Sequence, residues 1–581
     1  MSQQKNNNTF WQIKNYLTYS NQFGKHNVTA MVGQEAWESS WDYLGGSGND
    51  LSSDEVHNLA LATKTSYSIS SGFGSAAMAS FFTRLNYNFD DRYLLTYTYR
   101  YDGSSNFGPK NRWAGFHSFA ASWKFTNEGF MKDQDILETG KLRVGWGQTG
   151  NSNIGGYAWG SAISRMPSAL GSGYRPANIP NEAIRWEKQE QVNVGIDLGF
   201  FHNRFNVTVD AYDKISKDML MSMQLPSYMG TQGNGSSALA APKGNYGSID
   251  NRGLEFTFDA HIIDREKFGW TSNFQISFNR NKLLSLDGTE NANLVGYGQW
   301  SDVVCVSEVG SSLYNFYGYE VEGVYTSLDD IQNSALPAKS MILNDDGTYS
   351  HNDASYYNKN STTWVGDIKF KDINNDGVID EKDRTNIGSP LPVFTFGWTN
   401  TFRYGNFDLS LFFNGSYGNK VLNYNAITLT HMNSTWTNQI VSKIADRAIL
   451  VPADGVYADN WYYDITNVVV SNPTTKTPRA SLADPNDNDR ISDRYVEDAS
   501  YIRLKNITLG YTLPKSILSN AHIENVRVYV NIQNLLTLTG YSGYDPEVGA
   551  STQDSTGLTY GLDNGRYPSP TMYSCGVNIT F

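Results

Sequence analysis

Hydrophobic and polar positions alternate strictly along many short stretches of the chain. Between Val192 and Phe200, an apolar side chain occupies every second position, and Asn, Gly or Asp occupies each position between them. The stretches 93–101, 526–533 and 573–581 repeat this period of two. Such a period is that of a β-strand whose two faces meet different surroundings. Because about 10 residues span a bilayer when the strand is tilted, the pattern predicts membrane-spanning strands.

Strands of this kind recur from one end of the chain to the other. We count about 15 of them, which predicts an all-β protein built as a transmembrane antiparallel β-barrel. The predicted strands lie near 9–19, 27–37, 79–89, 92–101, 113–125, 141–148, 186–200, 205–213, 251–261, 270–280, 393–403, 407–417, 501–512, 526–537 and 572–581. Because bacterial single-chain barrels have even strand numbers, the odd count leads us to expect further strands upstream.

The connections between these strands alternate between short and long. Short links lie near 90–91, 201–204, 262–269 and 404–406. Outer-membrane barrels combine short periplasmic turns with long extracellular loops. If the last strand descends to a periplasmic C-terminus, every long stretch falls outside the cell. We therefore interpret residues 1–581 as barrel with extracellular loops at about 38–78, 149–185, 214–250, 281–392, 418–500 and 538–571.

Composition supports this interpretation and excludes several function classes. The chain is rich in Tyr (37) and Gly (52), and aromatic residues make up 14% of it, as expected for strands and turns. The mean hydropathy of -0.46 fits a barrel, because only one face of each strand meets lipid. The net charge of -13 argues against a nucleic-acid-binding protein, which needs a positively charged surface. The sequence contains no zinc-protease, nucleophile-elbow or phosphate-loop motif, so we predict no enzyme. A soluble β-propeller would show a repeat of about 40–50 residues, and we find none.

Two further features concern the termini and the cysteines. The first residues lack the apolar core of a signal peptide, which an exported outer-membrane protein needs. We therefore expect the complete protein to carry more sequence before Met1. Cys305 and Cys575 form no spaced motif, and both a disulfide and two unpaired side chains remain open.

Six motifs follow one another in a fixed order. They are Leu142-Arg-Val-Gly-Trp-Gly-Gln-Thr-Gly-Asn151, Trp186-Glu-Lys188, Gly247-Ser-Ile-Asp-Asn-Arg-Gly-Leu-Glu255, Gly366-Asp-Ile-Lys-Phe-Lys-Asp-Ile-Asn-Asn-Asp-Gly377, and the stretches 495–514 and 528–547. Together they resemble the SusC/RagA group of TonB-dependent outer-membrane transporters of the Bacteroidetes. The resemblance covers the chain from near residue 9 to its end.

The resemblance implies a fold and a function. The family barrel encloses a plug, and plugged transporters have 22 strands, so the strands found here would be the last fifteen, with the plug absent. The complete protein would sit in the outer membrane and import oligosaccharides or oligopeptides with a SusD-like surface lipoprotein. TonB would act through the missing N-terminal part. The alternatives are a passive porin, a surface-binding barrel, or a truncated fragment without function.

One stretch has the spacing of a calcium-binding loop. Oxygen ligands at loop positions 1, 3, 5, 7 (backbone), 9 and 12, with Gly at position 6, surround Ca²⁺ in such loops. Here these positions are Asp372, Asn374, Asp376, Val378, Asp380 and Asp383, with Gly377 at the turn. We predict a structural Ca²⁺ there. The alternative is a metal-free turn rich in Asp and Asn.

Aromatic residues supply two further hypotheses. Those in the long stretches are candidates for stacking on sugar rings or gripping peptide side chains, although packing within the loops or at the lipid headgroup belt is the favoured explanation for any single one. They include Trp159, Tyr174, Trp300, Trp364, Trp436 and Trp461. The C-terminal Phe581 closes an alternating strand. It resembles the terminal signal by which outer-membrane barrels are recognised for assembly.

Overall fold

A computed structural model describes most of the chain. It covers residues 1–581 apart from 52, 54, 56, 57, 132, 170, 224, 226, 231–237, 287–291, 434–437, 519–522 and 551–556. The described residues form two compact units, 1–258 with 281–292 and 259–280 with 293–581. Among the described residues, no helix has the length and apolar character needed to cross a membrane.

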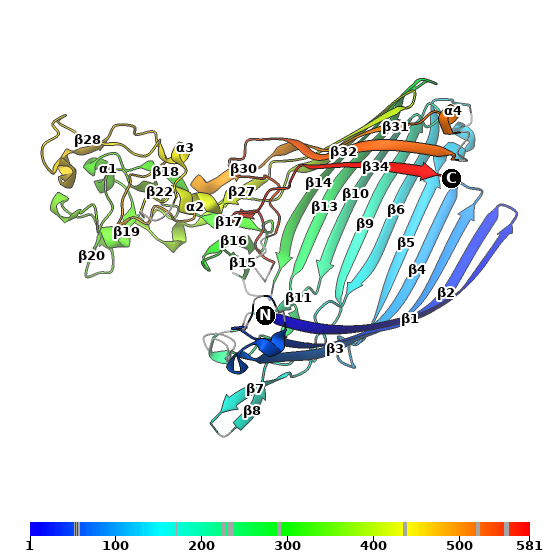
Figure 1. Cartoon of the computed structure of the whole chain (residues 1–581), viewed down its shortest axis with the longest axis horizontal. Helices are drawn as coiled ribbons and strands as arrows, with labels where there is room; N and C mark the ends of the chain where they lie inside the picture. The colour runs from blue at the N-terminus through cyan, green and yellow to red at the C-terminus, as the bar shows by residue number, and fades with distance from the viewer. Residues whose placement is uncertain are drawn as a thin grey trace. The chain divides into compact units, whose positions relative to one another are not determined.

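The long strands form one 15-stranded sheet, in which they follow one another in chain order. That order is β1 (Ser2–Phe23), β2 (His26–Ser47), β3 (Ser68–Phe89), β4 (Tyr93–Ser104), β5 (Trp113–Lys124), β6 (Leu137–Asn151), β9 (Glu187–Phe200), β10 (Phe205–Lys217), β13 (Ser248–Asp264), β14 (Phe268–Ser285), β25 (Phe394–Tyr404), β26 (Phe407–Tyr417), β31 (Tyr501–Thr512), β32 (Asn525–Thr539) and β34 (Met572–Thr580). Figure 1 shows strands β1–β6, β9 and β10 lying side by side in chain order. Each of the fifteen predicted strands corresponds to one of these.

The first strands are longer than the alternation predicted. β1, β2 and β3 have 22 residues each, about twice the number that spans a bilayer. β2 pairs with β1 and β3 along its full length, as far as Ser47. The backbone hydrogen bonds between β2 and its neighbours continue beyond the residues at which apolar and polar side chains stop alternating. The predicted loop 38–78 is therefore wrong in its bounds, and the connection spans 48–67. The other long connections shift by a few residues.

The long connections of the first unit carry small elements of their own. These are β7 (Ile163–Ser168) with β8 (Gly171–Pro176), and β11 (Leu220–Ser222) with β12 (Lys243–Asn245). A small core in the same unit joins Phe107 and Phe116 to Trp186, with ring centroids 5.2 and 5.6 Å from the indole. Trp186 belongs to one of the six motifs, and its role is packing.

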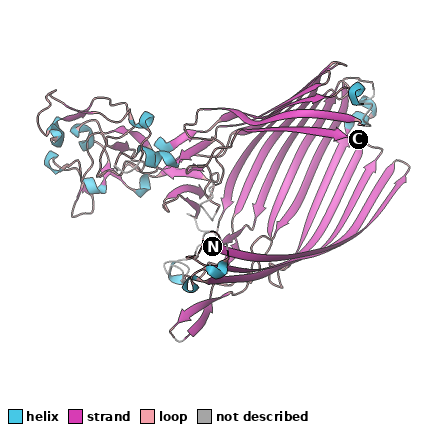
Figure 2. Ribbon diagram, viewed as in Figure 1, coloured by secondary structure: helices cyan, strands magenta, loops and turns pink. Residues whose placement is uncertain are grey.

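The second unit contains a folded body that we call the loop module, residues 293–393 and 418–500. Figure 2 shows its helices and strands to be short. The strands are β15 (Asn293–Tyr297), β16 (Val303–Glu308), β17 (Asn315–Gly318), β18 (Val321–Val324), β19 (Leu336–Pro337), β20 (Ile342–Leu343), β21 (Tyr349–Ser350), β22 (Ile368–Phe370), β23 (Val378–Ile379), β24 (Thr385–Gly388), β27 (Lys420–Asn423), β28 (Leu450–Pro452), β29 (Val468–Val470) and β30 (Val496–Asp498). The helices are α1 (Leu328–Gln332), α2 (Tyr424–Thr430) and α3 (Val441–Ile444). Outside the module, α4 (Lys515–Leu518) follows β31, and β33 (Leu562–Asp563) pairs with β27.

The loop module has its own hydrophobic core. Tyr325, Ile331 and Val365 have no exposed surface, and Trp364 is 1% exposed. These residues come from segments with no regular hydrophobic period. The alternation of apolar and polar positions therefore gave no sign of this core, and the segments were predicted as loops. The interpretation of 281–392 and 418–500 as plain loops is therefore incomplete. Most of both stretches folds around apolar side chains.

Candidate functional site

The long strands carry ion pairs on one face and apolar side chains on the other. Arg143 on β6 binds Asp197 on β9 at 2.8 Å and Asp210 on β10 at 3.0 Å. Val192 and Val194, at alternate positions of β9, are 44% and 45% exposed. Since facing residues of paired strands share one side of a sheet, the strands have a polar face and an apolar face. This is the pattern of a barrel wall between a polar lumen and lipid.

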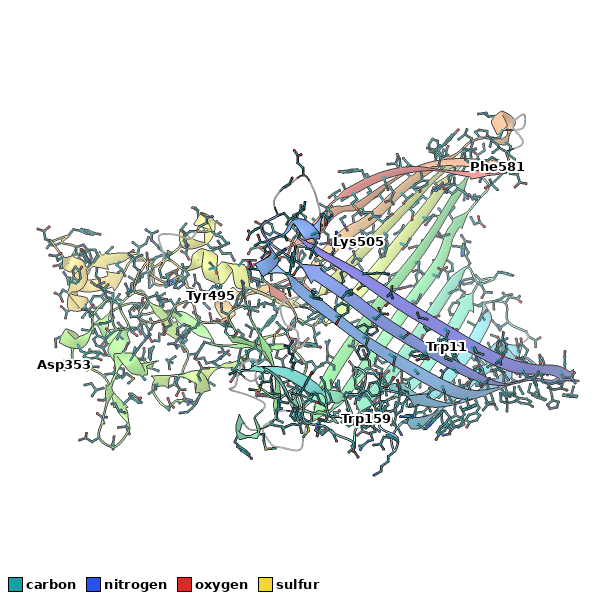
Figure 3. All side chains as sticks on the ribbon, turned by 60° about the horizontal axis from the view of Figure 1, so that its bottom comes forward. Trp11, Trp159, Asp353, Tyr495, Lys505 and Phe581 are labelled. Carbon is teal, nitrogen blue, oxygen red and sulfur yellow. The ribbon has the colours of Figure 1, made fainter. Side chains whose placement is uncertain are left out.

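A buried arginine ties the segment after β32 to β31. Arg503 is 2% exposed, and its guanidinium meets Asp545 at 2.5 Å and Glu547 at 2.8 Å. Lys505, labelled in Figure 3, lies 3.5 Å from the same glutamate. Arg503 and Lys505 belong to the motif at 495–514, and the two acids to the motif at 528–547. The structure therefore joins two motifs that the sequence showed only as neighbours in order.

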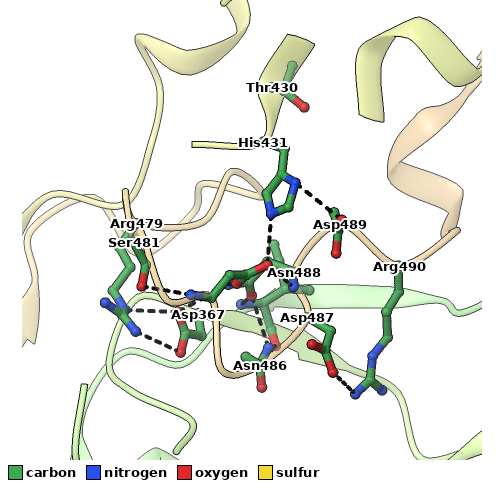
Figure 4. A network of polar contacts seen from close by, with 12 residues as sticks. Asp367, Thr430, His431, Arg479, Ser481, Asn486, Asp487, Asn488, Asp489 and Arg490 are labelled. Atoms are coloured by element: carbon green, nitrogen blue, oxygen red, sulfur yellow. Dashed lines mark hydrogen bonds and ion pairs between the residues drawn. The ribbon is translucent and has the colours of Figure 1, made fainter. Parts of the chain in front are cut away.

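A second buried pair stands at the centre of the loop module. Asp367 has no exposed surface, and Arg479 lies 2.8 Å from it (Figure 4). Burial outweighs the nearby guanidinium and raises the pKa of Asp367. Asn488 donates a hydrogen bond to the same carboxylate at 3.2 Å. Because a buried carboxylate without partners is costly, this network holds segments 366–368 and 479–488 together.

Beside this network, a histidine contacts two aspartates. Nε2 of His431 lies 3.0 Å from Asp484 and Nδ1 lies 3.2 Å from Asp489 (Figure 4). Burial lowers the pKa of His431, but the hydrogen bond to Asp484 and the charges of both acids outweigh it and raise the pKa. Within the described residues, this is the one trio of His, Cys, Asp or Glu with ligand atoms all within 4.8 Å of one another. Sequence reasoning missed it, because the histidine lies more than 50 positions before the acids.

The predicted calcium loop adopts the turn that its spacing implies. The Asp372 carboxylate accepts a hydrogen bond from the Gly377 backbone N–H at 2.8 Å. Gly377 has a φ of 83°, where a side chain would be strained. Buried Asp383, at position 12, accepts from the N–H groups of Ile373 and Asp380 at 2.9 and 2.8 Å. The first and last acids therefore brace the loop from both ends.

The donor set of the loop fits a cation in part. Oδ1 of Asp372 is buried and has no hydrogen-bond partner, as expected of an oxygen reserved for an ion. In contrast, Lys382 Nζ lies 3.7 Å from Asp376 and 3.5 Å from Asp380, so an ammonium group sits beside two of the predicted ligands. Calcium binding at this loop stays a prediction.

The aromatic candidates have different environments. Trp364 is packed in the core, and Trp159 and Trp461 pack against apolar clusters. Among the candidates that the structure describes, Tyr174 and Trp300 expose most of their surface, at 74% and 59%. Trp436 lies outside the described residues.

The terminal residue and the cysteines complete the predicted features. Phe581 follows β34 and is 84% exposed (Figure 3), and its assembly role stays a prediction. Cys305 is buried and Cys575 is exposed, and neither forms a disulfide.

Comparison with known proteins decides the family. A family model described as the β-barrel of TonB dependent receptor-like proteins matches residues 2–338. The chain belongs to the TonB-dependent receptors. TonB-dependent receptor P3 of Formosa agariphila is 32% identical over 98% of this chain, and the match covers 52% of that receptor. TonB-dependent receptor SusC of Bacteroides thetaiotaomicron is 28% identical over 97% of this chain, and 49% of SusC is covered.

A solved structure supports the fold of this TonB-dependent receptor. The RagAB peptide transporter matches with a TM-score of 0.78 and 23% identity, over 100% of this chain and 56% of that chain. The predicted SusC/RagA type and the predicted outer-membrane location are confirmed. The relatives are named as receptors and transporters, so the prediction that the protein is not an enzyme is confirmed as well. The chain spans about half the length of the curated relatives it matches.

Proposed function

We propose that the complete receptor imports oligosaccharides across the outer membrane, driven by TonB and aided by a SusD-like surface lipoprotein. The similarity to SusC over 97% of the chain carries this proposal. Import of oligopeptides is the second candidate, because a structural relative is named as a peptide transporter. The polar strand face would line the path of the substrate, and outer-membrane lipid would cover the apolar face.

The proposal extends to the part of the receptor that the chain does not span. The fifteen strands would be the last of a 22-stranded barrel that encloses a plug. TonB would engage a segment outside residues 1–581. In this arrangement the loop module would contribute to substrate capture and to contacts with the lipoprotein.

Uptake by living cells tests the proposal. Cells expressing the receptor with its lipoprotein would be given labelled neutral hexasaccharides and, separately, tetra-alanine, in strains with and without TonB. We expect saccharide uptake that disappears when TonB is removed. Uptake that persists without TonB would indicate a passive porin, and binding without uptake a surface-binding barrel. Absence of both would fit a truncated, inactive fragment.

We also propose that the loop 372–383 binds a structural Ca²⁺. Its support is the bracing of the loop by Asp372 and Asp383 and the unpartnered Asp372 Oδ1. When Ca²⁺ binds, the ammonium group of Lys382 would move away from the carboxylates of Asp376 and Asp380, which would bind the ion instead. We expect Ca²⁺ to protect this segment from proteolysis and a chelator to remove the protection.

A matched pair of variants isolates the predicted calcium loop. Asp372→Ala removes the first ligand, whereas Asp345→Ala removes an exposed carboxylate elsewhere in the module. We expect the protective effect of Ca²⁺ to vanish in the first variant and to persist in the second. Equal protection of both variants would contradict a calcium site at this loop.

A further inference from the structure

A cavity in the loop module, lined in part by charged side chains, is built from segments far apart in the sequence. Its volume is 470 Å³, within the range of about 300–1,000 Å³ typical of small-molecule sites. The lining includes Asp302, Tyr319, Glu381, Arg384, Asp487 and Arg490. The backbone of Tyr319 accepts a hydrogen bond from the N–H of Asp493 at 3.0 Å and donates one to Ile491 at 2.9 Å. Two of the lining segments are thereby locked together.

The two arginines of the cavity are held in place before any ligand arrives. The guanidinium of Arg384 lies over the Tyr317 ring at 4.7 Å and donates to the Val303 carbonyl at 2.6 Å. The guanidinium of Arg490 lies over the Tyr319 ring at 5.2 Å. Cation–π contacts of this kind restrain long side chains, so a ligand meeting them has less ordering to impose.

The charges of the lining disfavour an anionic ligand. Arg384 is paired with Glu381 at 3.0 Å, and Arg490 with Asp487 at 3.3 Å. Asp302 adds a third carboxylate, which leaves three acids against two guanidinium groups, apart from Asp380, whose carboxylate lies 3.5 Å from Lys382. An anion would find each cation already paired and would meet an excess of negative charge.

The donors and acceptors of the lining that have no described partner can bind adjacent hydroxyl groups of a ligand. The described contacts of Arg490 use its Nη2 atom, which leaves its other N–H donors for a ligand. Asp302 accepts from the Tyr424 hydroxyl through Oδ2 at 2.6 Å, and no described contact uses its Oδ1. Planar donors and acceptors that line one cavity match the paired hydroxyls of a sugar ring.

An exposed aromatic ring stands next to the Asp302 side of the cavity. Trp300 is 59% exposed and stacks on Tyr424, with ring centroids 5.1 Å apart. Tyr424 is in turn fixed by its hydrogen bond to Asp302. The free face of the indole is a flat apolar surface of the kind that packs against the C–H face of a sugar.

We propose that this cavity, with Trp300 beside it, is a binding site for a neutral saccharide. The proposal rests on the proposed uptake of oligosaccharides and assigns part of substrate capture to the loop module. One sugar ring of a hexasaccharide would bind between Asp302 and Arg490. A further ring of the same molecule would then stack on the indole of Trp300.

The test measures binding by the receptor purified from outer membranes in detergent. The probes are neutral hexasaccharides of glucose, mannose and xylose, a uronic-acid hexamer and tetra-alanine. We expect at least one neutral hexamer to bind, and the uronic-acid hexamer to bind about tenfold more weakly or not at all. Trp300→Ala and Asp302→Asn should each raise the dissociation constant of the neutral hexamer about threefold to tenfold, as expected for losing one stacking or hydrogen-bonding contact.

Matched controls separate this cavity from general loop effects. Tyr567→Ala removes another highly exposed aromatic ring, and Asp345→Ala another exposed acid of the same unit. Both should leave binding unchanged. The proposal is overturned if no neutral hexamer binds, if tetra-alanine or the uronic-acid hexamer binds in its place, or if Trp300→Ala and Asp302→Asn behave like the controls.

The uptake assay distinguishes this proposal from the proposed function. Saccharide binding that depends on Trp300, combined with uptake that is independent of TonB, would keep the site and reject TonB-driven import. TonB-dependent saccharide uptake with unchanged binding by Trp300→Ala would keep the function and reject the site.

Discussion

The long strands and the loop module treat their apolar side chains in opposite ways. On β9, Val192 and Val194 stay 44% and 45% exposed, because the strand turns them away from the polar face that carries Asp197. In the loop module, Tyr325 and Trp364 are 0% and 1% exposed. The strands thus depend on lipid to cover their apolar face, whereas the module supplies its own core. One chain is adapted to two solvents.

This difference between the strands and the loop module indicates which region is more sensitive to substitution. A barrel wall has to satisfy backbone hydrogen bonds and to present one face to lipid, and many sequences do this. The module has to pack irregular segments around buried polar pairs such as Asp367–Arg479, which tolerates less change. Under the proposed function, we expect the substrate-selecting features of the receptor in the module more than in the strands.

The largest expected effect comes from emptying the module core. Trp364→Ala should destabilise the module by about 3–5 kcal/mol, the usual cost of truncating a buried Trp. The strands should stay folded, because none of their backbone pairing involves this residue. Protease sensitivity of residues 293–500 and heat-modifiable gel mobility of the barrel would report the two regions separately. Simultaneous loss of both would show that the regions fold as one.

A charge on the apolar strand face tests the other region. Val194→Arg should cost about 2–4 kcal/mol if the side chain lies at mid-bilayer, while Asn193→Arg, on the opposite face, should cost much less. Folding yields into lipid vesicles of the two variants provide the measurement. Equal yields would contradict the assignment of the two faces.

The smallest expected effect concerns pH and the contact between His431 and its acids. The pKa of His431 is raised in the folded protein, with Asp484, Asp489 and Arg494 facing the ring. The stabilisation is therefore complete below the ordinary pKa of about 6.5 and is lost as pH rises through the folded-state pKa. His431→Gln should cost the module about 1–2 kcal/mol at pH 6 and little at pH 9. Protease sensitivity of the module at both pH values checks this, and a pH-independent deficit would contradict it.

The sequence predicted the strands well because their signal is local. Apolar side chains at every second position from Val192 to Phe200 report the two environments of β9 directly. The signal failed at 38–47, where β2 continues with no alternation because pairing to β1 and β3 holds it. The calcium spacing predicted the turn at Gly377, but the placement of Lys382 beside Asp376 and Asp380 had no signature in the spacing.

By itself, the sequence determined the fold class, the number of long strands and the family, since period, length and motif order are all readable along one dimension. Tertiary structure alone decided the rest. It brought Asp302, Tyr319, Glu381 and Arg490 around one cavity, closed the Arg503 ion cluster, and placed His431 between two acids. Each of these groups joins segments whose separation along the chain is large. Such contacts depend on how irregular segments pack, and no local pattern records that packing.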